Sequence, residues 1–82
     1  MDMKTYILRE LTDLTEAAEY KGAELFFEYA PHVDKVFVRL YRNGFDRGTP
    51  DLSIEIFVAG QPYSEKAALQ SLQGIKETVE NL

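Results

Sequence analysis

The sequence changes its hydrophobic period twice along the chain, and this change limits the folds open to it. In three central segments, residues 24–29, 35–41 and 51–58, apolar residues alternate with other residues. The flanking segments, residues 2–20 and 64–82, instead repeat apolar residues every three or four positions. A period of two indicates β-strands with one buried face, and a period near 3.6 indicates amphipathic helices. The predicted order is helix, three strands, helix.

The ends of both predicted helices carry suitable residues. Asp2 is a favourable N-cap for the first helix, and Lys21-Gly22 is a favourable end because glycine readily adopts the left-handed conformation. Ser64 is a favourable N-cap for the second helix. Packing both helices on one face of a three-stranded antiparallel sheet buries every apolar row. We therefore predict a single small α+β domain over residues 1–82.

The residue types argue against catalysis and against metal binding. The 82 residues include no cysteine and one histidine, so disulfides and cysteine-ligated metals are excluded. His32 has only Asp34 nearby in the sequence, and one carboxylate does not complete a metal site. Ser64 fits a helix cap better than a nucleophile, because no base accompanies it in any pattern. We expect no cofactor, no metal and no enzymatic activity.

Charge and hydropathy predict the compartment and the class of partner. Uninterrupted apolar runs reach four residues, far fewer than a membrane-spanning helix needs. The first residues, Met1-Asp2-Met3-Lys4, lack the basic and apolar stretches of a signal peptide, so we expect a cytoplasmic protein. The net charge of −5 disfavours bulk attraction to nucleic acid or to anionic lipid.

The register of the first two strands follows from keeping their apolar residues on one face. A tight turn at Pro31-His32 satisfies this condition. The pairs predicted from it are Glu28 with Lys35, Phe26 with Phe37, and Glu24 with Arg39.

The second and third strands are not joined by a two-residue hairpin in this interpretation. Asn43-Gly44 usually favours such a hairpin, but it would place the two apolar sets on opposite faces. A longer loop centred near Arg47 keeps them together. The pairs predicted from it are Phe37 with Phe57, and Arg39 with Glu55.

These registers predict an aromatic row, Phe26–Phe37–Phe57, on the sheet face opposite the helices. A second row of alternating charge, Glu24–Arg39–Glu55, would lie beside it. An exposed apolar patch of a few hundred Å² is typical of an interaction site. The interface residues predicted on this basis are Phe26, Phe37, Arg39, Tyr41, Phe45, Glu55 and Phe57. Two alternatives stay open: the row steadies a small sheet, or a helix covers it.

The leading hypothesis is a non-enzymatic protein–protein interaction module that uses this aromatic face. Its partner is either a second copy, giving a homodimer, or a larger protein. Small acidic domains of this kind are common among accessory, regulatory and inhibitor proteins, phage-encoded ones included. The alternative is a nucleic-acid-binding module that uses Arg39, Arg42, Arg47 and the sheet phenylalanines. Its weakness is that glutamates flank these rings and would repel phosphates.

The order of elements resembles that of double-stranded-RNA-binding domains. Ser64-Glu65-Lys66-Ala67-Ala68 is similar to the start of their last helix. That resemblance implies RNA binding through several lysines at this helix start. This chain has only Lys66 there, with Glu65 beside it, so the resemblance covers topology only.

Small residues also recur along the last helix. Ala67, Ser71, Gly74 and Thr78 are spaced by four, three and four positions, which places them on one side. A glycine inside a helix costs about 1 kcal/mol relative to alanine, which favours a close approach by another element. The expected neighbour is the first helix, and the alternative is a partner subunit.

Overall fold

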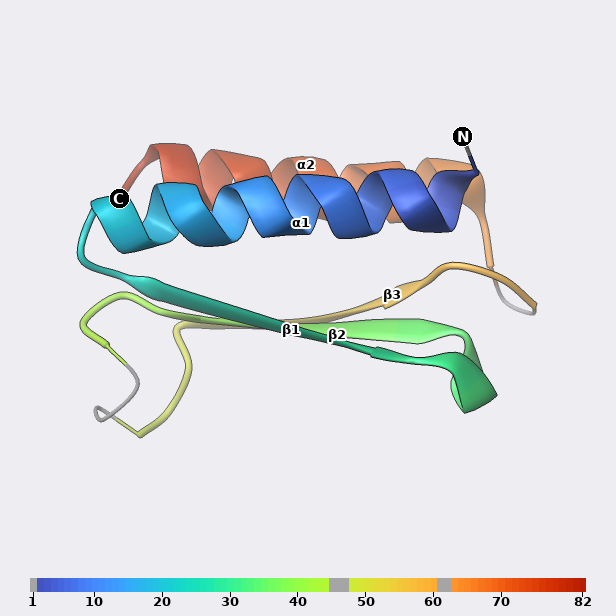
Figure 1. The fold of residues 1–82 in the computed structure, drawn as a ribbon, viewed down its shortest axis with the longest axis horizontal. Helices are drawn as coiled ribbons and strands as arrows, with labels where there is room; N and C mark the ends of the chain where they lie inside the picture. Colours follow the sequence, from blue (N-terminus) through green and yellow to red (C-terminus); the bar gives the residue numbers. More distant parts are fainter. Residues whose placement is uncertain (1, 45–47, 61–62) are drawn as a thin grey trace.

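The computed structural model describes residues 2–44, 48–60 and 63–82. Its elements are α1 (Met3–Tyr20), β1 (Glu24–Ala30), the short 3-10 helix η1 (Pro31–Val33), β2 (Lys35–Tyr41), β3 (Leu52–Phe57) and α2 (Glu65–Glu80). The strands form one antiparallel sheet in the order β1-β2-β3, and both helices lie on one face of it (Figure 1). The predicted α+β fold, with both helices on the same face, is confirmed.

The two helices run side by side in the same direction (Figure 1). Each helix runs antiparallel to the strand next to it in sequence. Three antiparallel strands separate α1 from α2, so β1 and β3 run in the same direction and the two helices are parallel to each other. Their carboxyl ends, each with partial negative charge, therefore lie at the same end of the molecule. The Lys21 ammonium compensates for this by donating hydrogen bonds to the carbonyl oxygens of Val79 (3.0 Å) and Glu80 (2.9 Å). The residue that ends α1 thus also caps α2.

The predicted helix caps are confirmed. The Asp2 carboxylate accepts a hydrogen bond from the Thr5 N–H at 2.7 Å, and this bond lowers the pKa of Asp2 below its usual 3.8. Gly22 follows α1 with φ of 83°, the left-handed conformation expected of a glycine there. At the start of α2, the Ser64 hydroxyl accepts a hydrogen bond from the Ala67 N–H at 3.3 Å.

The core lies between the helices and the sheet. Val36, Val38 and Leu40 of the central strand are completely buried there. Ile7 and Ile75, from the two helices, are equally buried. These residues belong to the alternating and helical patterns of the sequence, so the patterns identified the core-facing side of each element.

Gly74 does not pack against α1, so the predicted close approach of the first helix is wrong at this position. A Cβ atom placed on Gly74 would meet nothing within 4 Å. The side of α2 that contacts α1 is a different one, as the ion pair between Lys76 and Glu10 (3.3 Å) indicates.

The predicted register of β1 and β2 is wrong by two residues. Glu24 lies opposite Tyr41, Phe26 opposite Arg39, and Glu28 opposite Phe37. The turn explains the difference. The 3-10 helix and Asp34, which is left-handed with φ of 53°, place four residues between the paired Ala30 and Lys35. The prediction assumed a two-residue turn. A shift of two keeps every side chain on its expected face.

The predicted register of β2 and β3 is also wrong by two residues. Lys35 lies opposite Phe57, Phe37 opposite Glu55, and Arg39 opposite Ser53. Asp51 joins the end of the connection to the end of β2, and this contact sets the observed register. Its carboxylate accepts from the Arg42 N–H at 2.7 Å, and its own N–H donates to the Leu40 carbonyl at 2.8 Å. The rejection of a two-residue hairpin is correct, since residues 42–51 join the strands.

Candidate protein-interaction surface

The sheet has an outer face, which points away from α1 and α2. Both helices lie on the opposite side of the sheet in Figure 1. The strand alternation assigns one residue in two to the outer face. These residues are Glu24, Phe26 and Glu28 of β1; Lys35, Phe37, Arg39 and Tyr41 of β2; and Ser53, Glu55 and Phe57 of β3.

The aromatic rings share the outer face but do not form the predicted row. Phe37 lies between Glu28 and Glu55, and Phe26 lies opposite Arg39. The predicted charge row Glu24–Arg39–Glu55 is absent for the same reason. Rings and charges instead alternate across the strands. Phe26 is 38% exposed, and Phe37 and Phe57 are half-buried.

Lys35 links two of the rings to a carboxylate. Its ammonium lies 2.8 Å from Glu55 Oε1, 4.9 Å from the centroid of the Phe57 ring and 5.9 Å from that of Phe37. Cation–π contacts and a partly exposed ion pair are each weak, but together they restrict the position of the ammonium. Lys35 is therefore engaged within the sheet.

Arg39 is available for an incoming group. It is exposed, and within residues 2–44, 48–60 and 63–82 it forms no ion pair. Together with Glu28, Phe37 and Ser53 it lines a shallow hollow of about 240 Å³. The hollow combines an aromatic ring with a guanidinium and a carboxylate. Such a site can receive an apolar side chain while Arg39 binds a carboxylate of the same partner.

The remaining predicted interface residues differ in their positions. Tyr41 is 5% exposed, and its ring meets that of Phe26 edge-on at 5.7 Å. Tyr41 thus packs against Phe26 and adds little accessible surface. Arg42 is exposed at the start of the β2–β3 connection. Phe45 and Arg47 lie outside the described residues.

Four outer-face residues are not among the predicted interface residues: Glu24, Glu28, Lys35 and Ser53. Alternation places each of them on the same face as Phe37. They were left out because the predicted registers put other residues beside Phe37. The number of unpaired residues in each connection would have identified them. That number depends on the turn conformation, which the sequence pattern does not give.

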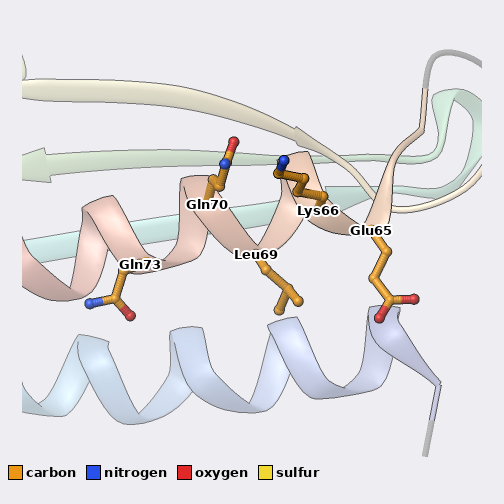
Figure 2. Close-up of a pocket in the computed structure, with 5 residues that line it drawn as sticks. All are labelled: Glu65, Lys66, Leu69, Gln70 and Gln73. Carbon is orange, nitrogen blue, oxygen red and sulfur yellow. The ribbon is translucent and has the colours of Figure 1, made fainter.

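A second hollow lies on the helix side of the molecule, over α2. It is lined by Glu65, Lys66, Leu69, Gln70 and Gln73. Figure 2 shows Glu65, Leu69 and Gln73 pointing toward α1, while Lys66 and Gln70 point away from it. Leu69, 37% exposed, is its single aliphatic residue. This surface is broad, open and formed by flexible polar side chains of one helix, so the outer face is the better candidate.

The part of the chain that the structure describes contains no group of three or more His, Asp or Glu residues able to hold a metal ion. None of its helices is long and apolar enough to cross a membrane. Comparison with protein-family models, curated proteins and solved structures found no match to this chain. The outer face is therefore interpreted from its own chemistry.

Proposed function

We propose that this chain is a non-enzymatic protein-interaction module, of accessory, regulatory or inhibitor type and acting in the cytoplasm, that binds a protein partner through the outer face. The observation that carries the proposal is a sheet face that bears three phenylalanine rings and has both helices on its other side. Exposed aromatic area is unfavourable by about 25 cal/mol per Å². A partner that covers these rings removes that cost.

The hollow around Phe37 suggests how such a partner is recognised. An apolar side chain of the partner would lie against the Phe37 ring, and a carboxylate would meet the Arg39 guanidinium. Apolar contact of this kind supplies affinity, and the charge pair fixes orientation. Buried aromatic anchors with arginine beside them are the usual centre of protein interfaces.

The charge balance of the outer face favours a protein over nucleic acid. Lys35 is paired with Glu55, and Glu28 lines the same hollow as Arg39. A phosphate backbone would therefore meet no excess of positive charge there. The partner is also better taken as a different protein than as a second copy on this face, because the self-complementary charge row is absent.

Site-specific photocrosslinking tests this proposal. A photoreactive phenylalanine analogue, benzoylphenylalanine, replaces Phe26 on the outer face or Tyr20 on α1, in cells of the native host. Tyr20 is the matched control because it is an aromatic residue with 93% exposure on the other side of the molecule. We expect one protein to crosslink from position 26 and not from position 20. Crosslinks of equal yield from both positions, or from neither, would contradict the proposal.

A further inference from the structure

The free edge of β3 presents unpaired backbone groups. The Val58 N–H donates to the Asp34 carbonyl at 2.9 Å, and the Leu40 carbonyl accepts from Asp51. Hydrogen-bonding residues alternate along an antiparallel pair, so even-numbered residues of β2 and β3 bond to each other. The N–H and C=O groups of Ser53, Glu55 and Phe57 therefore point away from β2, in the plane of the sheet, at its free edge. Within the described ranges, no other strand pairs with this edge.

The space above this edge is open. Ala67 and Ser71 of α2 line a small hollow together with Glu55 and Phe57 of β3. Nothing lies within 4 Å of the position that a Cβ atom would take on Gly74. A further element placed beside β3 would therefore find room next to the small side chains of Ala67, Ser71 and Gly74.

The core-facing residues of β3 leave apolar surface beside the same edge. Leu52 and Ile54 are only half-buried, although they point to the helix side of the sheet. Their neighbours on the central strand, Val38 and Leu40, are completely buried. A strand added to β3 would bury the exposed parts of Leu52 and Ile54 and satisfy the free backbone groups.

The charges along α2 indicate what that added element is. Lys66 and Glu77 are eleven positions apart, about three turns, and so lie on the same side of the helix. Figure 2 shows Lys66 pointing away from α1. Neither Lys66 nor Glu77 has an ion-pair partner among the described residues. An identical helix placed antiparallel to α2 would bring Lys66 of each copy close to Glu77 of the other.

We propose that two copies of this chain associate through the free edges of β3 about a two-fold axis. The two sheets join into one continuous antiparallel sheet, and the two α2 helices lie antiparallel above the junction. A pairing centred on Ile54 sets Ser53 of one copy opposite Glu55 of the other, which avoids like charges directly across the strands. Both outer faces stay open on the same side, so the assembly offers two copies of the partner-binding surface.

A charge-exchange experiment tests the antiparallel α2 contact. Sedimentation equilibrium is run on the wild type, Lys66→Glu, Glu77→Lys and an equimolar mixture of the two variants. We expect a wild-type dimer, a dissociation constant raised at least tenfold in each variant alone, and dimer restored in the mixture, where opposite charges meet again. Glu16→Lys, an exposed charge reversal on α1, is the control and should leave the dimer unchanged. A mixture that stays as weak as the single variants would overturn the proposal.

A proline substitution tests the strand edge. In Ser53→Pro the lost N–H points away from β2, so the internal ladder stays intact, and Leu52 before it is already extended. We expect a monomer with unchanged circular dichroism. Phe37→Ser, on the outer face, should leave the dimer intact. A monomeric wild type at 0.5 mM, or a dimer that survives Ser53→Pro but dissociates in Phe37→Ser, would contradict the β3 interface. If the proline variant unfolds, the charge exchange decides.

Discussion

The two faces of the sheet come from the same three strands but differ in what holds their side chains. On the core face, Val36, Val38 and Leu40 are completely buried beneath the helices. On the outer face, Phe37 from the same strand is half-buried between Glu28 and Glu55, and Arg39 is exposed. The core face therefore supplies most of the stability. The exposed part of the outer face buries less apolar area and so contributes less to folding.

Neighbouring residues of β2 provide the strongest test of this contrast. Val38→Ser removes two methyl groups from a fully buried site and leaves a hydroxyl there, so we expect the free energy of unfolding to fall by about 2–4 kcal/mol. Phe37→Ser removes a larger but half-exposed ring, and we expect a loss of about 1 kcal/mol. Urea denaturation measures both. Equal losses would mean that the outer face is part of the core.

One cation, Lys21, stabilises the carboxyl end of the helix layer that covers the core face. Lys21→Met keeps most of the aliphatic stem but removes the two hydrogen bonds to α2 carbonyls. We expect the free energy of unfolding to fall by about 1 kcal/mol. Lys4→Met, near the start of α1, is a matched control, and we expect a smaller change there. The same loss in both variants would show that Lys21 has no special role.

Gly74 lies on a side of α2 that faces neither the sheet core nor α1. Because a Cβ atom there meets no neighbour, Gly74→Ala should raise the free energy of unfolding by about 0.5–1 kcal/mol. Gly22→Ala is the contrasting variant, since φ of 83° disfavours alanine, and it should be destabilising. Thermal denaturation measures both at a protein concentration low enough to favour monomers. Destabilisation by Gly74→Ala would show that the chain itself fills this space.

The smallest expected effect concerns pH and the start of α1. The hydrogen bond from the Thr5 N–H lowers the pKa of Asp2, so the charged carboxylate stabilises the folded state above pH 3.8. That stabilisation is lost as the pH falls through the lowered pKa. Asp2→Asn keeps a capping oxygen without the charge. Its stability should change less than that of the wild type between pH 5 and pH 2. An identical pH dependence in both proteins would show that the charge has no effect.

The two faces also differ in how well the sequence predicted them. Which face a residue occupies depends on whether its position is odd or even, and a two-residue register shift leaves this unchanged. The core assignments of Val38 and Ile56 therefore survived both register errors. Which residues are neighbours on the outer face depends on the absolute register. That register was set by the left-handed Asp34 and by the hydrogen bonds of Asp51, which hydrophobic periodicity does not contain.

The most direct test of the central claim is the affinity of Phe37→Ser for the protein that crosslinks to position 26. Titration calorimetry compares it with the wild type and with Leu69→Ser, which changes an exposed apolar residue on α2. If the outer face is the binding surface, Phe37→Ser stays folded and binds at least tenfold more weakly, while Leu69→Ser binds as the wild type does. A folded Phe37→Ser variant with wild-type affinity would contradict the claim.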